Sequence, residues 1–199
     1  MRTWFFILSI IFSLDTFAQS TNSTNKFSLE ITEVMGDLNK DSLLDKVVVC
    51  QDTVDETFPY RLQIYFAQPN GEFKLAVSST KLLQPQYPGG KNGIGSGNGF
   101  ASVTIRNGVV IVNNELLRGH YEHKFRFQNG NFELIGYSCV ASDGLGEMTT
   151  IDFNLSTGKR LKKTERYDTD KVLSDTKKKI LIRPLPKLQD LIPFENALF

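Results

Sequence analysis

Three Asn-Gly pairs, each between runs of alternating apolar and polar residues, constrain this chain more than any other feature. They stand at positions 70–71, 107–108 and 129–130. Both residue types tolerate the positive φ of a type I′ turn, and such a pair between alternating runs is the strongest short-range sign of a β-hairpin. The three pairs therefore predict three hairpins of adjacent antiparallel strands.

The segments around these turns repeat every second residue, whereas helical periodicity is nearly absent. A further hairpin is expected around residues 156–159. The predicted strands cover residues 27–31, 46–50, 61–66, 72–77, 100–106, 109–113, 121–127, 132–140, 148–155 and 160–167. The predicted fold class is all-β, mainly an antiparallel meander that forms a sandwich or a curved sheet. In the Pro-containing stretch 180–199 we expect a short edge strand and then a short helical segment around residues 188–192.

Residues 1–18 have the layout of a secretory signal peptide. Arg2 supplies a positive start, residues 4–14 are almost entirely apolar, and small residues precede a cleavage site after Ala18. The apolar run is shorter than the roughly 20 residues that cross a bilayer. The sequence thus predicts a cleaved signal, no transmembrane anchor, and a periplasmic or secreted protein.

The rest of the chain divides by composition. Residues 19–26 are polar and predict a disordered linker, while the length of 27–199 suits a single β-rich domain. The net charge is +1, which gives no global field that would attract nucleic acid. Nucleic acid is therefore not among the expected partners.

Oxygen-bearing side chains recur at alternate positions directly ahead of an apolar strand. They belong to Asp37, Asn39, Asp41 and Asp45, and the backbone carbonyl of Leu43 falls between the last two. Ca²⁺ takes six to eight oxygen ligands. Three carboxylates in one tight turn repel each other, and a divalent cation removes that repulsion. The pattern predicts a structural Ca²⁺ site formed by these five residues.

The same segment resembles the calcium loop of FG-GAP/VCBS-type repeats, whose pattern is Asp-x-Asn-x-Asp-Gly-x-x-Asp followed by a β-strand. The match holds at Asp37, Asn39, Asp41 and Asp45, and Ser42 stands where the family has glycine. The resemblance implies an ion that braces a strand–loop–strand unit. More loosely, residues 89–159 look like uncharacterised exported bacterial proteins that carry one such loop. A single copy cannot build a propeller of several blades.

Positive charge gathers near the end of the chain. The segment from Leu155 to Lys187 contains eleven Lys and Arg residues and four acids, which gives it a net charge of +7. In an exported protein such a segment can meet anionic envelope polymers or lipid head groups. The alternative is an ordinary solvated face.

Two residue pairs suggest chemistry. Cys50 and Cys139 are the only cysteines, and an exported chain permits either one disulfide or two free thiols. His120 and His123 suggest zinc, but residues three apart on a strand point to opposite faces. We therefore expect no zinc site at this histidine pair.

Two further features are interpreted as structural. The glycine-rich run at 89–99 is followed by a strand rather than a helix, so it predicts a surface loop instead of a phosphate cradle. Five aromatic residues in strands and loops can stack on sugars only if they share a face, and strand aromatics usually pack in the core. They are Phe58, Tyr60, Tyr87, Tyr121 and Tyr137.

These observations predict an exported, calcium-braced, β-rich binding or accessory protein of the bacterial envelope, without catalytic activity. Its expected partner is an envelope polymer, a glycan or a protein. One alternative is an extracytoplasmic hydrolase of a polymer that uses acids such as Asp143, Glu147 and Asp152. The other is an interaction or inhibitor module that docks through the basic C-terminal region.

Overall fold

The computed structural model describes residues 26–93 and 99–193, and these residues are mostly β-strand. They form two antiparallel sheets and one short helical turn, which confirms the predicted all-β class. The predicted signal peptide, the linker except Lys26, and residues 94–98 of the glycine-rich run lie outside the described residues.

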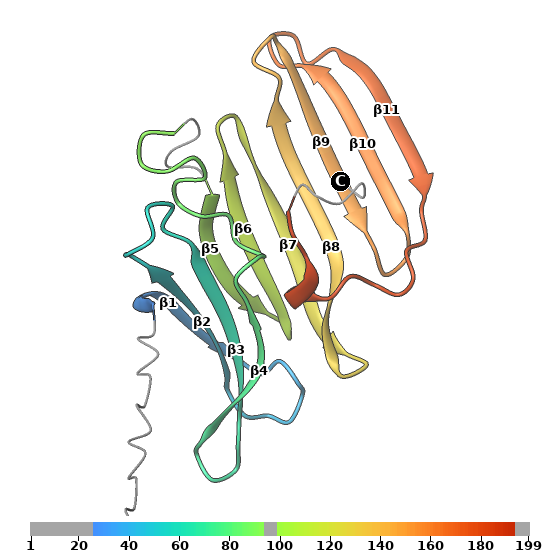
Figure 1. Ribbon diagram of the computed structural model, residues 1–199. Helices are drawn as coiled ribbons and strands as arrows, with labels where there is room; N and C mark the ends of the chain where they lie inside the picture. The colour runs from blue at the N-terminus through green and yellow to red at the C-terminus, as the bar shows by residue number, and fades with distance from the viewer. Residues whose placement is uncertain (1–25, 94–98, 194–199) are drawn as a thin grey trace, which may run out of the picture.

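The strands follow one another as two meanders (Figure 1). The four-stranded sheet has the order β1 (Phe27–Gly36), β2 (Asp45–Asp52), β3 (Tyr60–Ala67), β4 (Phe73–Ser79). The seven-stranded sheet runs from β5 (Gly99–Arg106) through β6 (Val109–Leu116), β7 (Gly119–Gln128), β8 (Asn131–Ser142), β9 (Glu147–Asn154) and β10 (Lys159–Arg166) to β11 (Val172–Lys179). Each strand pairs with its sequence neighbours, except that the chain changes sheet between β4 and β5.

Apolar side chains from both sheets form the core. Alternation buries one side of the central strands: Val47 and Val49 in β2, Leu62 and Ile64 in β3, Val110 and Val112 in β6. Phe66 of β3 meets Phe127 of β7 edge to face, with ring centroids 4.9 Å apart. This contact joins the two sheets, so the fold is a sandwich in which each inner face supplies alternate residues.

The larger sheet extends beyond the smaller one. Figure 1 shows β9, β10 and β11 on the side of β8 that is remote from β1–β4. Every residue of β11 is exposed, so this edge strand is held by its pairing with β10 alone. Within residues 180–193 the structure has an isolated β-bridge at Lys187 and no strand, so the prediction of a short edge strand is wrong for this described part of the stretch. β11, the edge strand before it, was not predicted and lacks apolar alternation.

The segment after β11 returns to the sandwich. The N–H of Ile180 donates to the carbonyl of Gly158 (2.7 Å), and the N–H of Leu134 donates to the carbonyl of Pro186 (2.8 Å). A 3₁₀ turn, η1 (Leu188–Asp190), then contacts β4 and β8, with Leu188 fully buried. The short C-terminal helical segment is thereby confirmed as one 3₁₀ turn.

Two of the Asn-Gly turns have the predicted backbone. Asn107 and Asn129 have φ of 52°, and the glycines that follow have φ of 71° and 72°. At the first pair only Gly71 has positive φ, and its N–H donates to Gln68 in a wider turn. The type I′ prediction is therefore wrong for that hairpin, although its two strands pair as expected.

Candidate functional site

The loop from residue 37 to 45 joins β1 to β2 and is ordered by side chains that accept backbone N–H groups. Asp37 accepts from Lys40 (2.6 Å) and Ser42 (3.1 Å), and Asn39 accepts from Asp41 (3.1 Å). Lys40 and Ser42 have φ of 68° and 69°. The left-handed backbone at Ser42 explains why glycine suits this position in the pattern that the loop resembles.

Asp45 has a different role from the other acids of the loop. Its side chain is 0 % exposed, and its two oxygens accept the N–H groups of Leu38 (2.8 Å) and Ala67 (3.0 Å). Ala67 ends β3, so one carboxylate ties the loop to two parts of the four-stranded sheet. Sequence spacing identified Asp45 as an oxygen donor, but this bond across 22 positions was not visible in the sequence.

The donor chemistry of the loop fits a hard cation, because its side chains offer carboxylate and amide oxygens. Asp41 already accepts the N–H of Leu43 (2.8 Å) and the side-chain amide of Asn39 (2.8 Å). Across residues 26–93 and 99–193, no three or more His, Cys, Asp or Glu side chains gather in a metal-binding arrangement. Calcium at Asp37, Asn39, Asp41, Leu43 and Asp45 stays a prediction.

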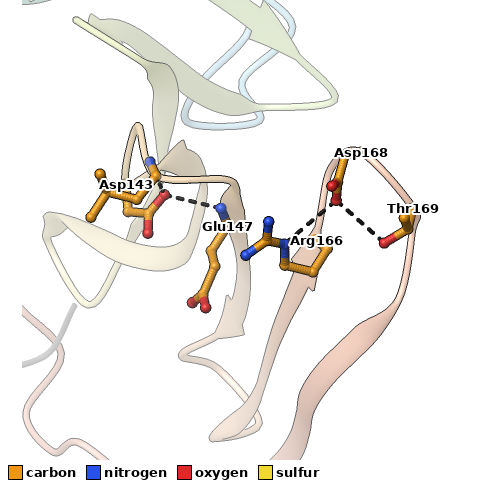
Figure 2. Close-up of polar contacts among 6 residues, drawn as sticks. Asp143, Glu147, Arg166, Asp168 and Thr169 are labelled. Atoms are coloured by element: carbon orange, nitrogen blue, oxygen red, sulfur yellow. Dashed lines mark hydrogen bonds and ion pairs between the residues drawn. The ribbon is translucent and has the colours of Figure 1, made fainter.

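Of the acids considered for hydrolysis, Asp143 lies in the β8–β9 turn, whereas Glu147 and Asp152 belong to β9. Figure 2 shows Asp143 accepting the backbone N–H of Glu147 (3.0 Å); it also accepts that of Leu145 (2.7 Å), and the Glu147 side chain extends away from it. These bonds lower the pKa of Asp143 below its ordinary value. A general acid needs a raised pKa, so Asp143 is suited to closing the β8–β9 turn rather than to protonating a leaving group.

The adjoining β10–β11 turn has the same construction. Arg166 Nε contacts Asp168 Oδ1 at 3.4 Å, and the hydroxyl of Thr169 donates to the same oxygen (Figure 2). The hydrogen bond from Arg166 lowers the pKa of Asp168. Both acids of these turns are therefore held in the ionised form.

The two histidines lie in opposite environments, as predicted. His120 is exposed, whereas His123 is 1 % exposed among the rings of Tyr121, Phe125 and Tyr137. Burial lowers the pKa of His123 to about 4. The imidazole is consequently neutral at pH 7 and belongs to the core.

The two cysteines are partly buried, and of the five aromatic residues Phe58 and Tyr87 are also partly buried and contact each other edge to face. Cys50 and Cys139 are free and lie in different sheets, so the structure has two thiols rather than a disulfide. Tyr60, Tyr121 and Tyr137 are buried. The predicted core role of these three aromatics is borne out by their burial.

The basic region folds largely into the outermost hairpin. Nine of its eleven cations lie in residues 159–179, on β10, β11 and their turn. Cross-strand pairing sets Lys159 directly opposite Lys179, and Arg160 directly opposite Lys178. Alternate residues of a strand point to opposite faces, so each face of the sheet carries one like-charge pair at this end of the hairpin.

Acids neutralise only the other end of the hairpin. Lys163 pairs with Glu165, and Arg166 with Asp168. Ion pairs to described residues are absent at the basic end, where a depression of about 380 Å³ is bordered by Thr157, Lys159 and Lys177–Lys179. The net charge of this segment was predictable from its composition, but the cross-strand pairing of like charges depends on a strand register that the sequence did not reveal.

Comparison with known proteins returns no match from protein-family models, from curated proteins or from solved structures. The resemblance to FG-GAP/VCBS-type loops therefore stays a prediction. Within the described part of the chain, none of the helical segments has the length and apolar character needed to span a bilayer.

Proposed function

We propose that the chain is an exported, non-catalytic binding protein whose basic hairpin, β10–β11, holds an acidic polysaccharide of the bacterial envelope. The observation that carries the proposal is that two cross-strand pairs consist of like charges, Lys159 with Lys179 and Arg160 with Lys178. Like charges directly opposite on neighbouring strands are destabilising. If the two charges lay about 5 Å apart in water, each pair would cost roughly 0.8 kcal/mol, and a bound polyanion would offset this repulsion by attracting both cations.

The distribution of charge favours a linear polymer over a flat surface. The two pairs lie on opposite faces of a free sheet edge, so a flexible chain can contact both faces by wrapping around β11. A membrane surface would reach one face only. Single-stranded nucleic acid would need exposed aromatic side chains for stacking, and the residues bordering this end are Thr and Lys.

The loop of residues 37–45 is proposed to hold Ca²⁺ as a brace. Asp37, Asn39, Asp41 and Asp45 would supply side-chain oxygens and Leu43 its carbonyl. Calcium modules outside the cell have a Kd near 10⁻⁴–10⁻³ M, so 1 mM Ca²⁺ would stabilise the fold by about 0.4–1.4 kcal/mol. The melting temperature should rise by roughly 1–5 °C with Ca²⁺. The same melt with Ca²⁺ and with chelator would contradict the site, and Asp41→Ala should abolish any shift.

Polymer binding is tested with polygalacturonate, a linear polymer of carboxylated sugars, by calorimetry at low and high salt. The double variant Lys159→Gln/Lys179→Gln should bind about tenfold more weakly, because two exposed ion pairs contribute roughly 1–2 kcal/mol together. The matched control is Lys74→Gln/Lys81→Gln, which removes the same charge from exposed positions outside the hairpin. Equal loss in both variants would contradict a hairpin site.

A charge reversal separates a binding site from a merely solvated face. Lys179→Glu converts the facing with Lys159 into an opposite-charge pair, which should raise stability by a few tenths of a kcal/mol or more. The same change should abolish polygalacturonate binding. A variant that is more stable and still binds as the native protein does would refute the role of this hairpin.

A further inference from the structure

We infer that the polysaccharide crosses the strands of the larger sheet along one row of residues, and that one acidic sugar unit sits in a groove over Gly136. This inference rests on the proposed function and adds the binding track and a subsite to it. The row is defined by strand register and contains Lys124, Gly136, Asn154, Lys159 and Lys179.

Successive pairings connect the row without a break. Lys124 of β7 faces Gly136 of β8, and Gly136 faces Asn154 of β9. Asn154 faces Lys159 of β10, which in turn faces Lys179 of β11. Directly opposite residues lie on the same face of a sheet. At about 4.8 Å a strand, the row spans roughly 19 Å, with cations at both ends and no charge in the middle.

This face is the outer one. His123 and Tyr137, the neighbours of Lys124 and Gly136 in their strands, point into the core. Lys124 and Gly136 therefore point away from it, because side chains alternate along a strand. On this side, which β1–β4 do not cover, Asn154, Lys159 and Lys179 are exposed and Lys124 is partly exposed, whereas Gly136 lies buried beneath the Lys124 side chain.

A groove lies over the first three positions of the row. It has a volume of about 240 Å³, and its lining includes Lys124, Arg126, Gly136, Asp152 and Asn154. The aliphatic part of the Lys124 side chain lies over Gly136, so a Cβ at this position would lie 3.2 Å from Cδ of Lys124 and would press on this groove cation. The cations Lys124 and Arg126 can bind the carboxylate of a sugar acid. The side chains of Asp152 and Asn154 can form hydrogen bonds with its hydroxyl groups.

The groove continues into a second cavity of about 380 Å³, which shares Arg126 and Ser156 with it. Its walls are fixed by hydrogen bonds. Arg183 donates to the carbonyls of Leu155 (3.1 Å) and Ser156 (2.7 Å). Glu133, 8 % exposed, accepts from Gln128 at 2.6 Å. Preorganised walls reduce the entropy that a ligand loses on binding.

The groove cation Lys124 has an internal partner that a ligand can replace. Its ammonium lies 2.8 Å from Glu122 Oε1, and both side chains are partly exposed. Exposed ion pairs of this kind contribute about 0–1 kcal/mol. A sugar carboxylate in the groove can therefore take over the ammonium at little cost.

The test uses oligogalacturonides of increasing length and the full-length chain. Affinity should rise with length until the fragment spans about 19 Å and then level off. Gly136→Val, which fills the groove with a residue favoured in strands, should weaken binding at least tenfold and remove the plateau. Lys124→Gln should weaken binding several-fold. Arg106→Gln, an exposed cation on β5, is the control and should bind normally. Circular dichroism checks that each variant is folded.

The outcomes separate the inference from the proposed function. Loss of binding in Lys159→Gln/Lys179→Gln, with full binding and an unchanged length plateau in Gly136→Val, would overturn the track and leave the hairpin site standing. Absence of oligogalacturonide binding by the native protein would overturn both. Equal binding to anionic phospholipid vesicles or to single-stranded DNA would overturn the assignment to an acidic polysaccharide.

Discussion

Removal of the Asp45 carboxylate tests the strongest polar contact in the loop between β1 and β2. The side chain is fully buried and accepts two backbone N–H groups, from Leu38 and Ala67. A hydrogen bond to a charged group contributes about 1.5–3 kcal/mol, so Asp45→Ala should cost roughly 3–6 kcal/mol. That cost is a large part of the free energy of unfolding of a typical domain, which is about 5–15 kcal/mol. Asp45→Asn keeps one acceptor oxygen and should cost about half as much.

The assay is urea denaturation followed by fluorescence, in chelator, so that any bound ion does not contribute. Asp41→Ala is the matched control, because Asp41 is exposed and water can replace its bond to the N–H of Leu43. Its cost should stay below about 1 kcal/mol. Comparable losses in Asp45→Asn and Asp41→Ala would refute the claim that burial sets the difference. If Asp45→Ala does not fold, the Asp45→Asn value decides.

Two further predictions concern the strands. His123 has a folded pKa of about 4 against an ordinary value near 6.5, so the unfolded chain binds its proton more readily. Stability should then fall by about 3 kcal/mol as pH drops from 7 to 4; His123→Leu should flatten this slope in urea titrations, while His120→Gln leaves it unchanged. Gly130→Ala meets only backbone strain at φ 72° and should cost about 1–2 kcal/mol. Gly119→Ala would drive Cβ into the Val140 carbonyl and should cost far more; similar thermal denaturation midpoints for the two would contradict this geometry.

Strands with an apolar side were predictable because burial imposes alternation. Leu62 and Ile64 recur at alternate positions of the predicted strand 61–66, and the structure buries both. The strand at residues 172–179 has no such signal, since every position is exposed and six of its eight residues are Ser, Asp, Thr or Lys. The position of β11 is set by its antiparallel backbone pairing with β10. Local pattern therefore predicts the sandwich and misses the edge that carries the proposed site.

In the candidate sites, too, local contacts were predictable from the sequence and long-range contacts were not. The sequence correctly marks the oxygen-rich loop, because its turn chemistry is local, and Asp37 accepts N–H groups only three and five positions away. Asp45 and the cation facings depend on partners far along the chain, which composition does not locate.

The position of the like-charge pairs is consistent with a site that can tolerate unfavourable electrostatics. Lys159 and Lys179 lie in the part of the larger sheet that extends past the four-stranded sheet, and Lys179 ends a strand exposed along its whole length. Repulsion there weakens one peripheral hairpin, whereas the core around Leu62 and Phe125 is untouched. Local stability can be low at such an edge while the global free energy of unfolding is set elsewhere. A polyanion that joins the two strands would then order this hairpin first, so amide exchange in β11 should slow on binding before exchange in β2 or β3 changes.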